Sequence, residues 1–287
     1  MKEKISLIVT VYNRLEYARN IIKCLLNQTV KIDELIFADD GSRENLFEAI
    51  EDLIPNCNFK IKHVYQEDFG FRASKNRNNG ARAAEGDILL FLDQDVIFSN
   101  DFIEKFLNNS KKGVFLFSRA IISTEREKLI IQDLIDSDEK YSEIYKKIDY
   151  SNKIKYRKKK NTKDIFYNFL YLIKLRDRGA KIPSMIFLIY KDDFEKVNGF
   201  DEKYEGWGHE DDDLFNRLYK SGCISKPLFY ELPPIHMWHY HETSKKESPN
   251  EEYYRQRKKE ISKENYRCEY GFSNMNRNDE YEVKVIK

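Results

Sequence analysis

The sequence predicts an α/β fold in which a mostly parallel sheet is covered by helices on both faces. Across about the first 100 residues, short runs of Ile, Val, Leu and Phe alternate with segments whose apolar residues recur at helical spacing. The run 86–95, GDILLFLDQD, is apolar on both faces of the expected strand, which is typical of a strand buried on both sides. Strands and helices that alternate in this way form the parallel sheets of nucleotide-binding folds.

Each element follows from its local pattern. The β-branched run 5–12 predicts the first strand, and Leu15, Ala18 and Ile22 place one apolar face on the helix behind it. By the same reasoning, the expected strands are 5–12, 33–42, 59–66, 86–95, 184–190 and 226–232. The expected helices are 14–28, 44–54, 74–84, 191–200, 210–222 and 250–267. The last 15 residues or so are expected to form a tail.

Composition narrows the class of protein. With 50 Lys and Arg against 49 Asp and Glu, the formal net charge is +1, so no global charge directs the chain to nucleic acid. No apolar run approaches the roughly 18–20 residues that span a bilayer, and the first apolar run is too short for a signal peptide. We therefore expect a cytoplasmic protein, soluble or peripheral, with reduced thiols. The cysteines match neither a zinc spacing nor a dense disulfide framework: Cys24, Cys57, Cys223 and Cys268.

Polar side chains lie at the carboxyl ends of three of the expected strands, the edge where parallel sheets gather their ligands. These side chains are Tyr12, Asn13, Arg14, Asp39, Asp40, Asp93 and Asp95. Each one alone is an ordinary turn residue, but together they indicate a site. The chain has no glycine-rich loop to hold phosphates, so a metal must be considered for that task. The carboxylates of "DQD" suit Mg²⁺ or Mn²⁺, and an imidazole from 233–242, PPIHMWHYHE, would favour Mn²⁺.

Residues 123–180 break the alternation of strands and helices. The segment begins with a helical amphipathic stretch, continues with the basic run 151–163, SNKIKYRKKKNTK, and ends with the aromatic run 164–175, DIFYNFLYLIKL. A charge run of this kind is usually a solvated face. The alternative is a cationic, aromatic surface that docks on an anionic membrane or holds an acceptor. A nucleic-acid interface is less favoured because no recognition motif flanks the run.

The stretch 206–213, GWGHEDDD, places four consecutive carboxylates behind a glycine-flanked tryptophan. Acidic residues are common at helix N-termini, and Asp212 is most simply such a first-turn acid. Asp211, however, shares one helical stripe with the apolar residues Leu214, Phe215 and Leu218. An inward carboxylate must be paired, bind a metal or open into a pocket, so Asp211 is the candidate catalytic base.

The third aspartate of the stretch has a different expected role. Asp213 lies four residues before Arg217 on the same helix. Such a spacing predicts a surface ion pair worth only about 0.3–0.5 kcal/mol.

Over roughly residues 4–100 and 184–250, the chain resembles the GT-A-fold nucleotide-sugar glycosyltransferases of family 2. Its second half resembles the carboxyl-terminal module of animal galactosyltransferases and chondroitin-type polymerases. The matching stretches are SLIVTVYNR, ADDGS, FRASKNRNNGARAAEGDILLFLDQDV, VNGFDEKYEGWGHEDDDLFNRL and the histidine segment. The resemblance implies a GT-A domain in two halves, with a helical, basic insertion and a helical carboxyl-terminal extension. The corresponding ranges are 1–122 for the nucleotide-sugar half, 183–250 for the acceptor and catalytic half, 123–182 for the insertion and 251–287 for the extension.

The resemblance also implies roles on the donor side. Tyr12, Arg14 and Asp40 would contact the uridine of a UDP-sugar, and Arg77 would lie near the ribose or diphosphate. Asp93 would contact the ribose or donor sugar. In the same way, Asp95 would hold Mn²⁺, or alternatively Mg²⁺, at the diphosphate.

On the acceptor side, Trp207 and Glu210 would line the sugar pocket, and Asp211 would be the general base. His209 departs from the related motif, which commonly has a glycine there, and could alter the sugar preference. The metal histidine is ambiguous. The galactosyltransferase-like register selects His241 and the pattern of bacterial relatives selects His239, with His236 third.

Taken together, these features predict an inverting, Mn²⁺-dependent transferase. It would move a hexose or N-acetylhexosamine from a UDP-sugar to a glycan hydroxyl. The acceptor would be an oligosaccharide or a lipid-linked glycan of a bacterial surface polysaccharide, capsule or lipopolysaccharide, with peripheral association at the inner face of the cytoplasmic membrane. Two alternatives remain: an inactive sugar-nucleotide-binding scaffold, and a UDP-sugar hydrolase or related nucleotidyltransferase.

Overall fold

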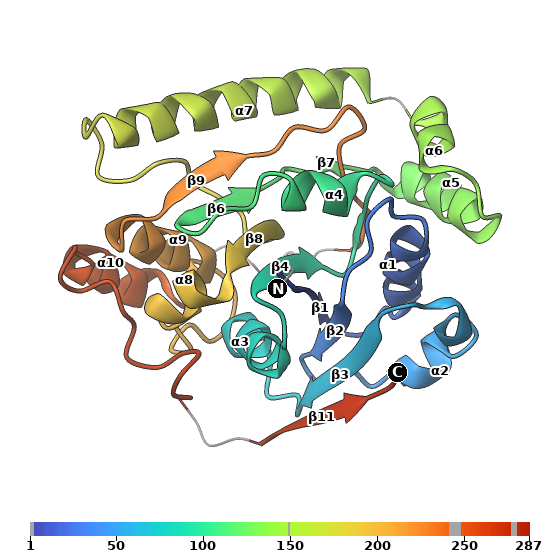
Figure 1. The fold of residues 1–287 in the computed structure, drawn as a ribbon, viewed down its shortest axis with the longest axis horizontal. Coiled ribbons are helices and arrows are strands. Elements are labelled where there is room, and N and C mark those ends of the chain that lie inside the picture. The colour runs from blue at the N-terminus through green and yellow to red at the C-terminus, as the bar shows by residue number, and fades with distance from the viewer. Residues whose placement is uncertain (1–2, 149, 241–247, 277–279) are drawn as a thin grey trace.

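The computed structural model describes residues 3–148, 150–240, 248–276 and 280–287. Within them, eight strands form one mixed sheet in the order β11-β3-β2-β1-β4-β8-β6-β9 (Figure 1). The parallel centre of this sheet contains β1 (Ile5–Val11), β2 (Glu34–Asp39), β3 (Lys60–Gln66) and β4 (Ile88–Asp93). The predicted α/β class is therefore confirmed.

The remaining strands extend the sheet or form a second one. Strand β8 (Ile186–Tyr190) is antiparallel to both β4 and β6 (Val114–Phe117), and β9 (Ile224–Pro227) is parallel to β6. A separate three-stranded sheet contains β5 (Val96–Ile97), β10 (Ile235–His236) and β7 (Ile121–Ile122). This small sheet brings the histidine segment next to the end of β4.

Helices cover both faces of the large sheet. The helices of the first half are α1 (Glu16–Leu26), α2 (Leu46–Ile50), α3 (Ala73–Ala83) and α4 (Phe102–Leu107). The insertion contributes α5 (Glu125–Asp136), α6 (Tyr141–Lys147) and α7 (Ser151–Leu172). The remaining helices are α8 (Lys191–Lys196), α9 (Glu210–Lys220) and α10 (Glu251–Glu260).

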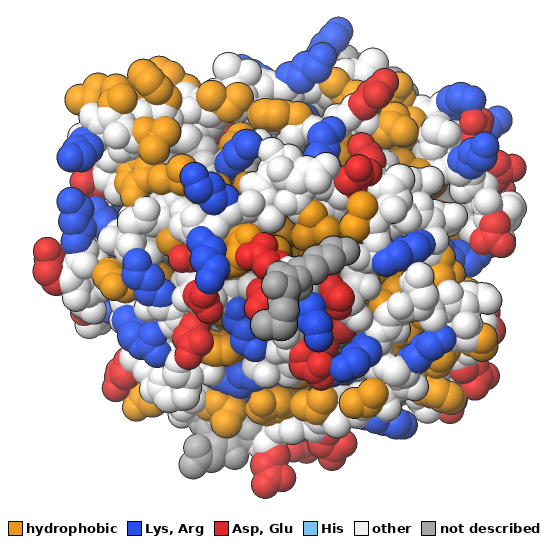
Figure 2. All heavy atoms as spheres, viewed as in Figure 1, with side chains coloured by type: hydrophobic (Ala, Val, Ile, Leu, Met, Phe, Trp, Pro, Cys, Tyr) orange, Lys and Arg blue, Asp and Glu red, His pale blue; other side chains and the backbone are white. Residues whose placement is uncertain are grey.

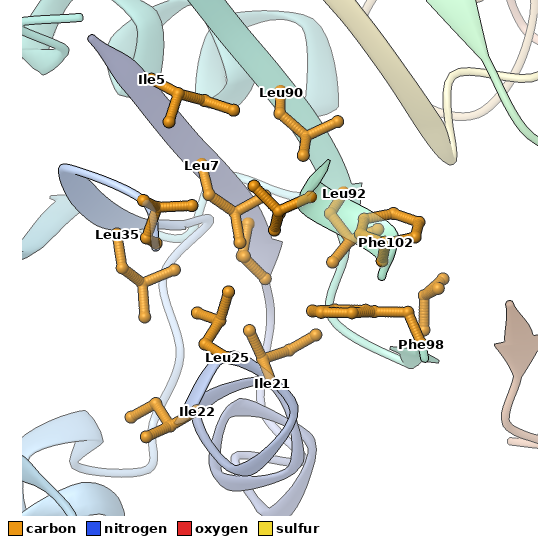
Figure 3. Packing of buried hydrophobic residues seen from close by; sticks show 14 of the residues in the cluster. Ile5, Leu7, Ile21, Ile22, Leu25, Leu35, Leu90, Leu92, Phe98 and Phe102 are labelled. Atoms are coloured by element: carbon orange, nitrogen blue, oxygen red, sulfur yellow. The ribbon is translucent and has the colours of Figure 1, made fainter. Parts of the chain in front are cut away.

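Alternate residues of β1 enter two different cores, because successive strand side chains point to opposite faces. On one face, Leu7 packs with Ile21 and Leu25 of α1 and with Phe98 and neighbouring side chains (Figure 3). On the other face, Ile8 belongs to a cluster that includes side chains of α3 and α9. Burial on both faces explains why these strands read as nearly continuous apolar runs.

Several expected elements differ from the structure. Helices α2, α8 and α10 end at Ile50, Lys196 and Glu260, short of the expected 54, 200 and 267. The expected tail contains β11 (Tyr281–Val285), which pairs antiparallel with β3 and closes that edge of the sheet. Its sequence YEVKV alternates apolar and charged residues, which is typical of a strand, although most of its side chains are exposed. The expected strand 226–232 lies earlier in the chain: β9 covers Ile224–Pro227, and the Leu228 N–H donates a last hydrogen bond to the Phe117 carbonyl of β6.

Helix α7 buries a polar stripe and exposes an apolar one, the reverse of an ordinary surface helix. Its body-facing stripe is polar and buried, and contains Arg157, Asn161, Asp164 and Asn168. Its outer stripe contains exposed apolar side chains, among them Ile165, Phe166, Phe169 and Leu172. Among the described residues, no helix combines the length and apolar character needed to cross a membrane.

Candidate active site

The carboxyl ends of β1, β2 and β4 meet at one edge of the sheet. The pairing register sets Thr10 beside Asp93 and Val11 beside Asp39, so the polar residues that follow these strands are brought together as predicted. Asp93 accepts hydrogen bonds from the Thr10 hydroxyl at 3.2 Å and from Arg77 Nη2 at 3.1 Å. Arg77 belongs to α3, and its side chain extends from that helix to Asp93 at this edge.

The loop after β1 holds the first two donor-side candidates in place. Asn13 and Arg14 both adopt positive φ, 51° and 52°, and the Arg14 backbone N–H donates to Glu44. The Tyr12 ring is 43% exposed, and its hydroxyl donates to Asp68. Tyr12 therefore offers an open aromatic face at the rim of this edge.

Asp40 is buried and bound by the protein itself. It accepts hydrogen bonds from the Gln66 side chain at 2.6 Å and from the Arg72 backbone N–H at 2.8 Å. Burial raises the pKa of Asp40 to about 6, and these two hydrogen bonds partly oppose the rise. Asp40 thus ties the loop ahead of α3 to the end of β2.

Asp95 lies beside two histidines. Its Oδ1 is 3.3 Å from Nε2 of His236, and its Oδ2 is 3.1 Å from Nε2 of His239. The small sheet makes this contact, because His236 pairs with Val96 and the Met237 backbone N–H donates to the Asp95 carbonyl. The structure therefore groups His236 and His239 with Asp95, whereas His241 falls outside the described residues.

The donor set at Asp95 fits the divalent metal that the resemblance implies. One carboxylate oxygen and two imidazole nitrogens lie within 4.8 Å of one another. Within the described part of the chain, buried Oδ1 of Asp95 and Nδ1 of His236 make no hydrogen bond. A mixed oxygen and nitrogen set suits Mn²⁺ better than Mg²⁺.

Asp211 lies in the first turn of α9 and lines a cavity of about 360 Å³. As predicted, its stripe partners Leu214, Phe215 and Leu218 are buried in the core. Burial raises the pKa of the Asp211 carboxyl to about 6, and the neighbouring charge of Glu210 adds to the rise. A carboxylate with a raised pKa beside a cavity is equipped to accept a proton near neutral pH.

Arg77 connects the two halves of the site. Its Nη1 is 3.7 Å from Oε1 of Glu210, while its Nη2 holds Asp93. Glu210 is buried, and its Oε2 makes no hydrogen bond to the described residues. One guanidinium therefore lies between a donor-side carboxylate and the residue that precedes Asp211.

The glycine-flanked loop before α9 exposes its tryptophan. Gly206 and Gly208 adopt φ of +78° and +106°, a region that side chains rarely enter, and Trp207 is 45% exposed between them. His209 faces α10: its ring bonds Glu251 at 2.8 Å and stacks on Tyr254 at 4.3 Å. The structure thus exposes part of Trp207 and uses the His209 ring to hold α10.

Asp212 has partners beyond the helix start. It is buried against Arg178 at 2.9 Å and accepts a hydrogen bond from the Tyr254 hydroxyl. Burial alone would raise the pKa of Asp212, but Arg178 and Tyr254 lower it below its usual value. This carboxylate therefore stays charged and anchors surrounding segments, a role that its position in the sequence did not reveal.

The prediction of a surface pair between Asp213 and Arg217 is wrong. Both side chains are fully buried, with Arg217 Nε 2.6 Å from Asp213 Oδ2. Arg217 Nη1 also donates to the backbone carbonyls of Val197 and Gly199. The i, i+4 spacing does produce the pair. The pair is buried because the segment after α8 covers this face of α9.

The sequence reasoning also missed basic residues around Asp211. Arg119, Lys181 and two lysines of α7 line the same cavity. These residues come from segments far apart in the chain. The basic run 151–163 indicated a cationic surface at Lys160 and Lys163, but no pattern connected it with Asp211.

Comparison with known proteins identifies the family. Residues 6–178 match the model of glycosyl transferase family 2, and residues 164–242 match the N-terminal domain of galactosyltransferase. Chondroitin synthase of Escherichia coli is 25% identical over 256 residues, which cover 80% of this chain and 35% of that protein. Hyaluronan synthase of Pasteurella multocida is 26% identical over 246 residues, covering 80% of this chain and 25% of that protein. The chain thus spans about a third or less of these relatives.

Solved structures support the fold. Staphylococcus aureus TarS 1-349, in complex with UDP-GlcNAc, superposes with a TM-score of 0.56 over 94% of this chain and 68% of that one. The sequence identity is 14%, so this similarity shows a shared fold and confirms the expected GT-A architecture. Because the first family match covers more than half of the chain, the protein belongs to glycosyl transferase family 2.

Proposed function

We propose that the protein transfers a hexose or N-acetylhexosamine from a UDP-sugar to a glycan hydroxyl, with inversion at the anomeric carbon. The observation that carries this proposal is the position of Asp211, which lines a cavity directly after Glu210, the residue that Arg77 joins to Asp93. A base on one side of the donor site and charged groups on the other suit a single displacement. We further propose that the reaction serves a bacterial surface polysaccharide and takes place at the cytoplasmic face of the membrane.

Asp211 would take the proton of the acceptor hydroxyl as that oxygen attacks the anomeric carbon and the UDP oxygen leaves from the opposite face. Arg77 would stay between the two carboxylates and keep Glu210 and Asp93 in position. The exposed part of Trp207 would offer an apolar surface to a sugar face.

Mn²⁺, when bound by Asp95, His236 and His239, would neutralise charge on the leaving diphosphate. Among the solved structures of similar fold, TarS has been determined with UDP and with UDP-GlcNAc, which supports a UDP-sugar as the donor. The scaffold and hydrolase alternatives use the same donor site. A scaffold needs no base beside a cavity, so the position of Asp211 favours an enzyme over a scaffold. A hydrolase would use the same base on water, so stimulation by an acceptor separates transfer from hydrolysis.

The donor and metal assignments predict linked binding. Mn²⁺ and a UDP-sugar together should raise the melting temperature, since a ligand at a hundredfold its Kd adds about 2.7 kcal/mol of stability. Asp95→Ala should remove most of this shift, whereas the control Asp192→Ala, whose side chain is 75% exposed on α8, should keep it. A panel of UDP-sugars in thermal-shift assays with and without Mn²⁺ provides the measurement. A full shift in EDTA or in Asp95→Ala would contradict the metal assignment.

We also propose that the outer face of α7 docks on an anionic membrane. A run of exposed apolar side chains along this face and the turn after it, each 46–72% exposed, contains Ile165, Phe166, Phe169, Leu172, Ile173 and Leu175. Hydrophobic side chains gather over this end of α7, at the upper left of Figure 2. Exposed lysines extend the face toward the start of the helix: Lys155, Lys158 and Lys159. An apolar face flanked by lysines matches the interface of an anionic bilayer.

Membrane docking predicts that the protein sediments with vesicles that contain phosphatidylglycerol and much less with pure phosphatidylcholine. The double variant Phe166→Ser/Phe169→Ser should weaken binding at least tenfold, since each buried Phe contributes about 1.5–3 kcal/mol. Phe47→Ser, a 42% exposed residue on α2, is the matched control. Equal sedimentation of all three proteins would contradict docking, and loss of a dimer in the double variant would assign the face to a second copy instead.

A further inference from the structure

The cavity beside Asp211 has strongly basic walls. Its walls are formed by α7, by Arg119 and by the segment 181–183. Asp211 of α9 also lines it. Its volume of about 360 Å³ is in the range of small-molecule sites. A group bound here would lie next to the candidate base, so the walls must contact whatever Asp211 deprotonates.

The positive charges of the cavity outnumber the negative ones. Four cationic side chains line it, namely Arg119, Lys160, Lys163 and Lys181, against the two carboxylates Asp164 and Asp211. Asp164 is already neutralised, because Arg119 holds it through two hydrogen bonds of 2.6 and 3.0 Å. The three lysines therefore face Asp211 with more charge than the protein balances.

The two α7 lysines at the cavity, Lys160 and Lys163, are not engaged by carboxylates of the described residues. Lys160 and Lys163 lie over the rings of Tyr156 and Tyr167, at 5.4 and 5.3 Å. Among the described residues, neither lysine forms an ion pair. The nearest acidic partner of Lys181 is Asp212, at 3.7 Å, and Asp212 is already held by Arg178.

Helix α7 is anchored to the body of the protein, which places the exposed Lys160 and Lys163 beside the cavity. The buried side of the helix is anchored through Asp164 to Arg119 and through Asn168, whose side chain donates to the Ser225 carbonyl. With that stripe facing the body, Lys160 and Lys163 fall at its margin and line the cavity, while neighbouring Lys158 and Lys159 do not. The basic run thus has two lysines at the cavity and two that face solvent away from it.

We propose that the acceptor is anionic, and that Lys160, Lys163 and Lys181 bind a carboxylate or phosphate group close to its attacking hydroxyl. This inference rests on the proposed function. A neutral sugar needs hydrogen-bond partners but gives the ammonium groups no counter-charge. An acidic sugar or a phosphodiester supplies one, in charge-assisted hydrogen bonds that are stronger than neutral ones. Such a group also selects against neutral glycans at the same site.

Three probes that share a glucose ring test the inference by binding alone: 4-nitrophenyl β-glucuronide, 4-nitrophenyl β-glucoside and glucose 6-phosphate. Each is titrated into the protein with UDP and Mn²⁺ and followed by calorimetry or ligand-detected NMR. At least one charged probe should bind about tenfold more tightly than the glucoside. The preference should decrease with added salt. The glucuronide and the phosphate together show which anionic group is preferred.

The variants locate the effect. Lys160→Gln/Lys163→Gln should abolish the preference, whereas Lys158→Gln/Lys159→Gln, with the same charge change on the same helix, should retain it. Equal binding of charged and neutral probes, no binding of either charged probe at millimolar concentration, or a preference that survives Lys160→Gln/Lys163→Gln would overturn the inference. UDP binding in the same samples separates the two proposals. If UDP binds and the anion preference is absent, only the acceptor inference fails; if the wild-type protein does not bind UDP, the proposed function fails.

Discussion

Replacing Asp211 with asparagine is expected to lower kcat for sugar transfer about 10²- to 10⁴-fold, the usual contribution of a general base. Asparagine keeps nearly the same shape but cannot accept the proton of the acceptor hydroxyl. Donor binding should be unchanged, because no donor-side group bonds to Asp211 in the structure's described hydrogen bonds and ion pairs. The measurement is kcat for transfer, together with Kd for UDP, in wild type and Asp211→Asn.

The pH dependence gives the same prediction an independent readout. The pKa of Asp211 is raised to about 6, first by burial and then by Glu210. A base acts only when deprotonated, so kcat/KM of the wild type should rise with pH and level off above about 6. Asp211→Asn should lose this limb while Asp192→Asn, on α8, keeps it. Near-wild-type transfer by Asp211→Asn, with UDP still bound, would rule out the role of base.

The second large effect concerns stability. Arg217→Met is expected to lower the free energy of unfolding by about 3–5 kcal/mol, because it leaves the buried Asp213 carboxylate without its hydrogen-bonded counter-charge. The Val197 and Gly199 carbonyls lose their donor as well. Urea denaturation of the variant and the wild type at neutral pH is the measurement.

The chain offers a matched control for this buried pair. Glu251 and Arg255 also form an i, i+4 pair, at 2.8 Å, but their side chains are 45% and 73% exposed. Arg255→Met should therefore cost less than about 1 kcal/mol. The double variant Asp213→Leu/Arg217→Met should recover part of the stability lost in Arg217→Met. A cost below 1 kcal/mol for Arg217→Met would mean that burial of the pair has little energetic consequence.

Much of the site was predictable because it depends on local pattern. Asp39, Asp40, Asp93 and Asp95 follow apolar runs, and parallel pairing brings the ends of those runs to one edge. The stripe of Asp211 with Leu214, Phe215 and Leu218 follows from helical periodicity alone. These features need no knowledge of which distant segments pack together.

The parts that were not predicted depend on distant packing. Whether Asp213 and Arg217 face water or the core depends on the segment 197–204 and on α10, which lie elsewhere in the sequence. The side of α7 that faces the body could not be read from its pattern, because the buried stripe is polar. Strand β11 has an alternating pattern of its own, but its partner β3 lies more than 200 residues earlier, and no local pattern specifies that pairing. His236 joins Asp95 only because a two-stranded pairing, β5 with β10, sets the register.

The most direct test of a UDP-sugar transferase is the rate of UDP release by the wild-type protein from a panel of UDP-sugars with Mn²⁺, with and without glycan acceptors. The proposed function predicts that release from at least one UDP-sugar is stimulated by an acceptor, is lost in EDTA, and yields a product with inverted anomeric configuration. Release of free sugar at a rate that no acceptor changes would show a hydrolase. Binding of UDP-sugars without any release would show a scaffold, and either result would contradict the transfer reaction.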